Sequence, residues 1–210
     1  MTEVVKKRGI LFIISAPSGA GKTTLVHTLV ESMPNLYVSI SHTTRTRRPY
    51  EKEGSDYHFV SVAEFETLVE KNMFLEHARV FDNYYGTSRA WVEEQLSDGK
   101  DIILEIDWQG ARQVTQLMPN AVSIFILPPC YETLESRLRD RGDEEDMVQR
   151  RMRDARAEMS HYDEYKFLVV NDDFDTALHE LTTIMQCMHN GYFQQKDFFD
   201  SFARQLLKNN

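Results

Sequence analysis

An apolar strand pattern runs directly into a glycine-rich loop near the N-terminus, and this junction constrains the fold more than any other feature. Residues Ile10–Ile14 are continuously apolar, and the sequence then reads SAPSGAGKTT from Ser15 to Thr24. A strand, a glycine-rich turn and a helix start, in this order, form the phosphate-binding pattern G-x-x-x-x-G-K-[ST] of α/β proteins. We therefore expect an α/β fold whose first strand leads into a loop for nucleoside triphosphates.

The loop retains the residue types that phosphate binding needs. Its glycines can take positive φ and let successive N–H groups point toward an anion. Lys22 can reach the β- and γ-phosphates, and the Thr23 hydroxyl can ligate Mg²⁺. Alanine replaces the first glycine, which is harmless if Ala16 has negative φ. An ordinary glycine turn before a helix is the disfavoured alternative. The predicted nucleotide loop is Ala16, Pro17, Ser18, Gly19, Ala20, Gly21, Lys22, Thr23 and Thr24.

The rest of the chain alternates apolar runs with helical patterns, which is typical of a parallel sheet covered on both faces. Predicted strands are Ile10–Ser15, Asp101–Asp107, Ala121–Leu127 and Phe167–Asn171. Predicted helices are Lys22–Glu31, Trp108–Met118, Tyr131–Arg141, Met147–Met159 and one from Phe174 onward. The segments between Tyr37 and Ala90 are shorter and alternate, which predicts a mixed, partly antiparallel insert. We interpret the tail from about Met188 to Asn210 as a helix that caps the domain, with a subunit interface as the alternative.

Length and charge exclude several classes of protein. A chain of 210 residues is expected to form one domain with inserted parts. The formal charge is −9, whereas wholesale binding of nucleic acid or an anionic membrane needs a basic surface. Cys130 and Cys187 lack metal-ligand spacing, and the sequence shows neither a signal peptide nor a run of ~18 apolar residues. We therefore expect a cytoplasmic protein without a nucleic-acid or membrane partner.

The insert carries a candidate pocket for a second substrate. Its first part, SHTTRTRR from Ser41 to Arg48, places three arginines among hydroxyl groups, and arginine binds phosphate bidentately. Tyr57 and the sequence NYYGTS, which begins at Asn83, add hydroxyl groups that can complete a phosphate cage. A solvated basic turn explains the arginines equally well, so this motif alone leaves both interpretations open.

Two carboxylates among apolar residues are candidates for reading a base. Glu76 lies in FLEHA, and Asp107 ends the run IILEID. A carboxylate only accepts hydrogen bonds, which suits the N–H edge of guanine and rejects a base that lacks those donors. Two alternatives stay open, because Asp107 also fits the magnesium-side acid of an NTPase and Glu76 also fits a salt bridge at a sheet edge.

Arginines are concentrated in one segment, since seven of the chain's fifteen lie within residues 137–156. Arg137 and Arg141 are four residues apart and share a helix face, while a glycine and an acidic run end that helix. The next predicted helix carries Arg150, Arg151, Arg153 and Arg156. A two-helix flap with arginines can close over phosphates and stabilise developing charge. Salt-bridged exposed helices are the alternative, which we prefer for Arg139 and Arg153.

Nine segments together resemble the guanylate kinase family, and they occur in the order that the family has. They are SAPSGAGKTT, SISHTTRTRRP, GSDYHFVS, FLEHA, NYYGTS, ILEIDWQGA, RLRDRG, RRMRDARAEMSHY and VVNDDFDTAL. They cover about residues 9–185. Bacterial members of the family also begin the loop with alanine, so Ala16 agrees with the resemblance.

The resemblance implies an enzyme of purine nucleotide metabolism that transfers the γ-phosphoryl group of ATP to GMP, with Mg²⁺ as cofactor and ADP and GDP as products. It implies a P-loop core with a parallel β-sheet flanked by helices (1–36, 91–136 and 157–210), a mixed α/β GMP-binding insert (37–90) and a helical lid (137–156). Acceptance of dGMP and a homo-oligomeric state stay open.

The resemblance also assigns roles to individual residues. The guanine would be read by Ser41 and Glu76 with help from Asp107, and the GMP phosphate would be held by Arg45, Arg48, Tyr57 and Tyr85. Thr87 would also bind GMP, since it keeps a hydroxyl where many relatives have serine. Phosphoryl transfer would involve Lys22, Arg45, Arg137, Arg141 and Arg151, and Asn171 would border the adenine. His42 stands where some relatives have a second serine and receives no role.

Two other functions remain as alternatives. A P-loop kinase for another acceptor, such as ribose 1,5-bisphosphate, should lack a complete guanine-reading set. A non-catalytic guanylate-kinase-like interaction module should have a degraded phosphate loop and lid. Ser41, Glu76 and Asp107 together argue against the first alternative, and Lys22, Thr23 and the lid arginines argue against the second.

Overall fold

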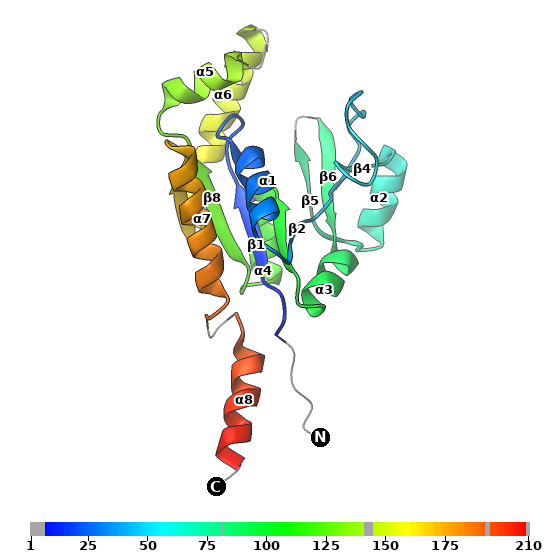
Figure 1. Ribbon diagram of the computed structural model, residues 1–210. Coiled ribbons are helices and arrows are strands. Elements are labelled where there is room, and N and C mark those ends of the chain that lie inside the picture. Colours follow the sequence, from blue (N-terminus) through cyan, green and yellow to red (C-terminus); the bar gives the residue numbers. More distant parts are fainter. Residues whose placement is uncertain (1–6, 81, 141–144, 192–193, 209–210) are drawn as a thin grey trace.

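The computed structural model describes residues 7–80, 82–140, 145–191 and 194–208. Figure 1 shows a central sheet with helices on both faces, a smaller sheet beside it, and a helical pair beyond the loop that follows the first strand. The last helix, α8, extends away from the opposite end of the central sheet. The phosphate loop therefore lies between the smaller sheet and the helical pair.

The central sheet has five strands in the order β2-β7-β1-β8-β9, and all neighbouring strands are parallel. Their bounds are β1 Leu11–Ser15, β2 Leu36–Val38, β7 Asp101–Glu105, β8 Val122–Leu127 and β9 Phe167–Val170. The four strands predicted from apolar runs are confirmed, and only their ends differ, by one or two residues. The sequence analysis missed β2, because three residues are too few to show a pattern.

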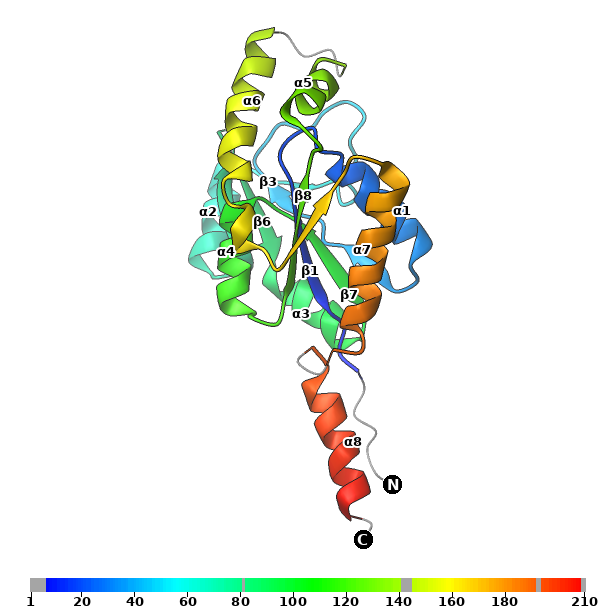
Figure 2. The ribbon, with the colours of Figure 1, turned by 90° about the vertical axis from the view of Figure 1, so that its left-hand side faces the viewer.

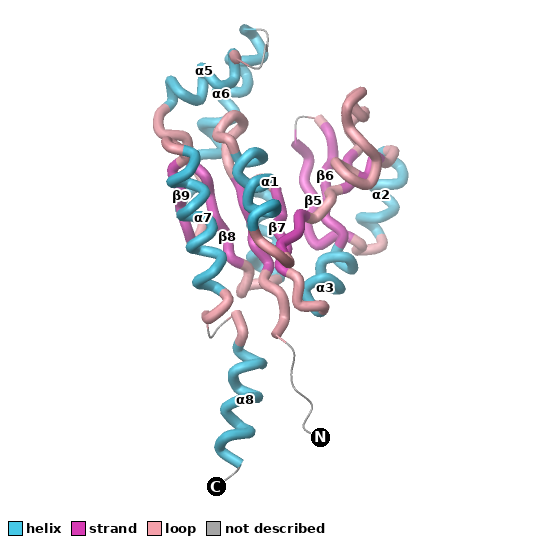
Figure 3. The backbone as a smooth tube through the Cα atoms, viewed as in Figure 1, coloured by secondary structure: helices cyan, strands magenta, loops and turns pink. Residues whose placement is uncertain are grey.

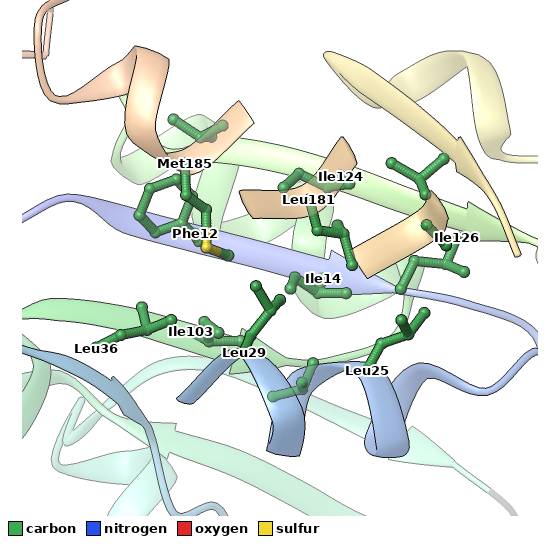
Figure 4. Packing of buried hydrophobic residues seen from close by; sticks show 14 of the residues in the cluster. Phe12, Ile14, Leu25, Leu29, Leu36, Ile103, Ile124, Ile126, Leu181 and Met185 are labelled. Carbon is green, nitrogen blue, oxygen red and sulfur yellow. The ribbon is translucent and has the colours of Figure 1, made fainter. Parts of the chain in front are cut away.

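Helices cover both faces of this sheet, and the alternation along β1 shows how. Phe12 and Ile14 pack among side chains of α1 (Lys22–Ser32) and α7 (Phe174–Met188), as Figure 4 shows. Leu11 and Ile13 belong to the other cluster, with side chains of α3 (Arg89–Ser97) and α4 (Trp108–Leu117). Successive strand residues point to opposite faces, so a continuous apolar run is what a doubly covered strand requires. Figure 2 shows α7 and α4 on opposite sides of the strands.

The region predicted as an insert forms a second, four-stranded sheet in the order β4-β3-β6-β5. Its strands are β3 His42–Thr43, β4 His58–Phe59, β5 Phe74–Val80 and β6 Asn83–Ser88. β3 and β4 are parallel, whereas the other pairs are antiparallel. The helix α2 (Val62–Glu70) packs on this sheet through the buried Phe65. The expected mixed, partly antiparallel sheet is thus confirmed.

The helical pair consists of α5 (Tyr131–Arg139) and α6 (Glu145–Met159). The two helices share an apolar seam of buried side chains, namely Leu134, Leu138, Val148, Met152 and Ala155. The helix predicted over Tyr131–Arg141 ends at Arg139, and Arg141 lies outside the described residues. The helix predicted from Met147 begins two residues earlier, at Glu145.

The tail after α7 forms the helix α8 (Lys196–Lys208). The interpretation that this helix caps the domain is wrong, because Figures 1 and 3 show α8 extending beyond the N-terminal ends of the central strands. The side chains of Phe202, Leu206 and Leu207 on α8 are exposed. Among the described residues, no helix is long and apolar enough to cross a membrane.

Candidate active site

The glycine-rich loop between β1 and α1 has the backbone conformation that its sequence predicts. Gly19 has φ 95° and Gly21 has φ 89°, values that favour glycine. The non-glycine residues with positive φ in the described part are Asn35, Asn72 and Asp82, so Ala16 lies outside that group and tolerates its methyl group. The loop leads directly into α1 at Lys22, which places a helix N-terminus beneath an anion site.

Two side chains, one after β9 and one on α5, support the loop. Asn171, buried after β9, donates from Nδ2 to the carbonyl oxygen of Ala20 at 2.7 Å. Arg137 of α5 donates to the carbonyl oxygen of Asn171 at 3.3 Å. A side chain at Gly19 would meet Leu134 of α5 at 3.0 Å, so the loop packs closely against the helical pair. The side-chain amide of Asn171 thus stabilises the conformation of the loop.

One acid next to the loop is Glu105, at the end of β7. Its Oε2 lies 3.9 Å from Nζ of Lys22 and accepts a hydrogen bond from the Thr23 hydroxyl at 3.4 Å. Asp107 instead caps α4, where Oδ1 accepts from the N–H of Gly110 at 3.0 Å. The geometry therefore favours Glu105 over Asp107 as the magnesium-side acid that the sequence analysis left open.

One cavity of about 350 Å³ joins the loop to the second sheet. From the core it is lined by the loop, by the ends of β7 and by the turn that contains Asp107. From the second sheet it is lined by Ser41, Tyr57, Glu76, Ala78, Val80 and Tyr85. Five residues predicted for the second substrate thus face the predicted nucleotide loop across one cavity: Ser41, Tyr57, Glu76, Tyr85 and Asp107.

Glu76 is the buried carboxylate of this cavity. Its side chain on β5 is 3% exposed, and Oε1 accepts a hydrogen bond from the Thr87 hydroxyl of β6 at 2.5 Å. Burial raises the pKa of Glu76 to about 7, and the nearby charge of Asp107 acts in the same direction. Within the described residues no salt bridge joins Glu76 to a basic side chain, so the alternative of an edge-strand ion pair is disfavoured.

Arg45 lies beside Tyr57 and Tyr85, the two tyrosines that line the cavity. Its guanidinium carbon is 5.3 Å from the ring centroid of Tyr57, and the rings of Tyr57 and Tyr85 are 6.0 Å apart. Glu51, which is buried, accepts from Arg45 at 2.6 Å and from the backbone N–H of Arg48 at 2.8 Å. Glu51 therefore orients both arginines by holding the turn that carries them.

The lid arginines differ in their surroundings. The second terminal nitrogen of Arg137 is buried and has no hydrogen-bond partner among the described residues. Arg151 lies half-buried on α6, whereas Arg153 is exposed. Arg139 pairs with Glu135 at 2.8 Å and with Glu145 at 2.9 Å, as preferred for an ordinary surface arginine. Arg48 is also exposed and donates to the Tyr50 hydroxyl at 3.1 Å.

Known proteins resemble this chain along most of its length. The family profile described as guanylate kinase matches residues 8–188. Guanylate kinase of Saccharophagus degradans is 54% identical over 200 residues, which covers 95% of this chain and 98% of the relative. Guanylate kinase of Chromohalobacter salexigens is 60% identical over 179 residues, which covers 85% of this chain and 83% of the relative. The chain belongs to the guanylate kinase family.

A solved structure agrees with this assignment. The crystal structure of guanylate kinase from Anaplasma phagocytophilum aligns with a TM-score of 0.77 at 35% identity, over 90% of this chain and 91% of that one. The predicted family and the P-loop α/β fold are therefore confirmed. As a guanylate kinase family member, the chain is a nucleotide-binding phosphotransferase.

Sequence reasoning missed three acids of this guanylate kinase fold. Glu105 was passed over because the aspartate two residues later ends the same apolar run. Glu51 stands in a polar turn, where nothing in the sequence separates it from Glu53. Glu158 lines the cavity and accepts from the backbone N–H of Ser18 at 3.3 Å, although 140 residues separate the two. The sequence offered one signal for Glu158: its spacing from Arg151 places both residues on the same face of one helix.

Proposed function

We propose that this member of the guanylate kinase family transfers the γ-phosphoryl group of ATP to GMP, giving ADP and GDP. One observation carries the proposal: the phosphate loop with Lys22 and the buried carboxylate of Glu76 line the same cavity. A buried carboxylate that reads a base is useful to a kinase with a nucleotide acceptor, and has no evident use in an enzyme that only hydrolyses ATP. The residues would act as a core (1–36, 91–136, 157–210), an insert (37–90) and a lid (137–156).

In the insert, Glu76 would accept hydrogen bonds from the N–H edge of guanine, with Ser41 and Asp107 at the rim of the same pocket. Thr87 would hold the Glu76 carboxylate in place through its hydroxyl. The GMP phosphate would lie against Arg45, Tyr57 and Tyr85, with Arg48 contributing from the same turn. Support for this assignment comes from the grouping of Arg45 with both tyrosines.

At the loop, residues Ala16 to Thr24 would bind the ATP phosphates through backbone N–H groups and Lys22. The hydroxyl of Thr23 and the carboxylate of Glu105 fit Mg²⁺, because both are oxygen donors and they already lie 3.4 Å apart. Bound Mg²⁺ would neutralise charge on the phosphates. Asn171 would border the adenine and would also support the loop through its hydrogen bond to Ala20.

For the transfer itself, a phosphate oxygen of GMP would attack the γ-phosphorus in line with the leaving ADP oxygen. The protein would contribute position and positive charge, without a covalent intermediate. Lys22, Arg45, Arg137, Arg141 and Arg151 would supply that charge. The buried nitrogen of Arg137 that has no hydrogen-bond partner among the described residues supports this role, because a buried donor needs an acceptor such as a phosphate oxygen.

The first test is a coupled assay of ADP release with Mg-ATP and one acceptor at a time: GMP, dGMP, AMP, CMP, UMP or ribose 1,5-bisphosphate. Turnover that is fast with GMP and absent with AMP, CMP, UMP and ribose 1,5-bisphosphate is expected. Turnover with ribose 1,5-bisphosphate instead would overturn the base pocket but keep the loop. A folded protein that uses no acceptor and binds no ATP by calorimetry would support a non-catalytic interaction module.

Lys22→Ala provides a second test of the same function. Removal of this charge should lower kcat by about 100-fold or more, because the lysine acts on the phosphate that becomes more negative in the transition state. Lys52, an exposed lysine of the insert, supplies the matched control, and Lys52→Ala should leave kcat unchanged. Near-normal turnover by Lys22→Ala would contradict the mechanism.

We also propose that the chain works in the cytosol and associates with a second copy through α8. Exposed thiols at Cys130 and Cys187 support a reducing compartment. The exposed apolar side chains of α8 support self-association.

A further inference from the structure

The C-terminal half of α6 is joined to the phosphate loop by one carboxyl group. Oε2 of Glu158 accepts a hydrogen bond from the backbone N–H of Ser18 at 3.3 Å, and the Glu158 side chain lines the cavity. The loop and this part of α6 are distant in sequence, so the contact links two separate elements. Ser18 lies at the start of the loop, four residues before Lys22.

The core fixes the end of α6 just beyond Glu158. The ring of His161 stacks on Trp108 with centroids 3.8 Å apart, which attaches the segment after α6 to the start of α4. Glu164, which follows, accepts from Arg112 at 2.6 Å and pairs with His161 at 2.6 Å. This end of α6 is therefore a fixed base, from which the rest of the helix extends over the loop.

Arg151 lies on the same face of α6 as Glu158. The two residues are seven positions apart, so they are two turns and roughly 10 Å apart along the helix axis. The seam of Val148, Met152 and Ala155 packs on α5 and fixes the rotation of α6. Because this seam fixes the rotation of α6, the contact between Glu158 and Ser18 sets the distance between the loop and the face of α6 that carries Arg151.

The groups around Glu158 allow both the ionised and the neutral carboxyl. Burial raises the pKa of Glu158 to about 7, Lys22 acts against this shift, and Asp107 and Asp154 reinforce it. Tyr165 faces the same group from the segment before β9. A neutral carboxyl retains a carbonyl oxygen that accepts from Ser18, so the link does not depend on charge.

We propose that Glu158 is a positioning residue that ties α6 to the phosphate loop and so sets the place of Arg151 over the transferred phosphoryl group. The inference rests on the proposed function, because only that function gives Arg151 a role in transfer. Glu158 itself need not touch the reacting atoms. Its effect on turnover is exerted through the position of another side chain.

The test is a double-mutant cycle of Glu158 and Arg151, with kcat and KM for ATP measured under saturating GMP. Glu158→Ala should lower kcat by about 10- to 100-fold, as expected for a misplaced catalytic group, with KM for ATP changed far less. Glu158→Gln retains the acceptor oxygen and should stay within about threefold of wild type. Arg153→Ala, an exposed arginine on the same helix, is the matched control and should keep wild-type kcat.

The double variant decides whether Glu158 acts through Arg151. If it does, Glu158→Ala combined with Arg151→Ala is no slower than Arg151→Ala alone. Multiplied effects, wild-type kcat in Glu158→Ala, or equal loss in Glu158→Ala and Glu158→Gln would each overturn the inference. Circular dichroism checks folding, and Glu158→Met, which keeps the volume but has no acceptor oxygen, repeats the test if the alanine variant unfolds.

Failure of the proposed function gives a different result in the same experiment. A wild-type protein that fails to turn over GMP contradicts that function before any variant is measured. Full kcat in Arg151→Ala removes the role of Arg151 and with it this inference. If the wild-type enzyme is active and the losses of kcat in Glu158→Ala and Arg151→Ala multiply in the double variant, this inference is overturned and the proposed function stands.

Discussion

In the proposed pocket, the protonation state of Glu76 would decide how guanine is bound. A protonated Glu76 is itself a donor and opposes the N–H edge of guanine, whereas the carboxylate accepts from it. Burial raises the pKa of this group to about 7, so both forms are present near neutral pH. A ligand with N–H donors binds the ionised form, which means that binding releases a proton below pH 7.

The pH dependence of GMP binding follows with a definite sign. KM for GMP should be highest in acid, fall as the pH rises through about 7 and level off above it, while KM for ATP follows a different profile. Glu76→Gln should raise KM for GMP by about tenfold or more and remove this pH dependence, since glutamine does not ionise. Steady-state kinetics from pH 5.5 to 8.5 checks this, and equal losses for GMP and ATP would remove Glu76 from base recognition.

Gly110 leaves room for the Glu76 carboxylate at the start of α4. A Cβ added at Gly110 would lie 2.5 Å from Oε2 of Glu76, too close for any side chain to tolerate without movement. Gly110→Ala should therefore displace the carboxylate and raise KM for GMP by about tenfold, although alanine favours helix over glycine. KM for ATP is the internal control. An unchanged KM for GMP would show that the Glu76 side chain can move away from the new methyl group without loss of binding.

The candidate site was predictable where the chemistry lies within a few consecutive residues. The loop around Lys22 could be found because backbone conformation and residue type are both local. Glu76 stood out as a charge inside an apolar run. Glu158 could not be found in this way, since its partner is a backbone N–H far away in sequence, and no residue pattern encodes that contact.

At the scale of elements, a strand or helix could be predicted when it contained enough residues to show a repeating pattern. The strands β1, β7 and β8 are apolar runs buried on both faces, and they were found together with β9, which is buried on one face, whereas the three-residue β2 was missed. The strands β3 and β4 contain two residues each, too few to show a pattern, and β3 is paired between β4 and β6. Tertiary contacts therefore define the insert, although its mixed character was visible.

The helix α2 begins with a complete capping box that can be tested separately from activity. The Ser61 hydroxyl accepts from the N–H of Glu64, and the Glu64 carboxylate accepts from the N–H of Ser61 at 2.8 Å. Ser61→Ala should lower the free energy of unfolding by about 1 kcal/mol, while kcat with GMP stays unchanged because α2 lies outside the cavity. Chemical denaturation measures the first value. A loss of kcat without loss of stability would show that α2 takes part in binding.

At the scale of the whole molecule, the two halves of the cavity come from separate packing units. The core supplies the loop at the carboxyl ends of parallel strands, where such sheets bind ligands. The second sheet supplies Glu76, the proposed base-reading group, and the helical pair approaches from the other side. Arg150 of α6 lies 3.8 Å from Asp82, at the turn between β5 and β6, so the helical pair and the second sheet contact each other. The direction of α8 was not predictable, because its amphipathic pattern fits a core and an interface equally well.

The apolar face of α8 gives the last prediction. Phe199, Phe202 and Leu206 lie on one side of the helix, and Phe202 is 56% and Leu206 60% exposed. If a second copy covers this face, wild-type protein should show a concentration-dependent dimer in sedimentation velocity, and Phe202→Asp with Leu206→Asp should remain monomeric. The cavity is remote from α8, so kcat with GMP per chain should be the same in both proteins. Arg204→Ala on the polar side is the control for the helix itself. A wild-type protein that stays monomeric at every concentration would contradict self-association through α8, and the exposed apolar side chains would then be a feature of the monomer.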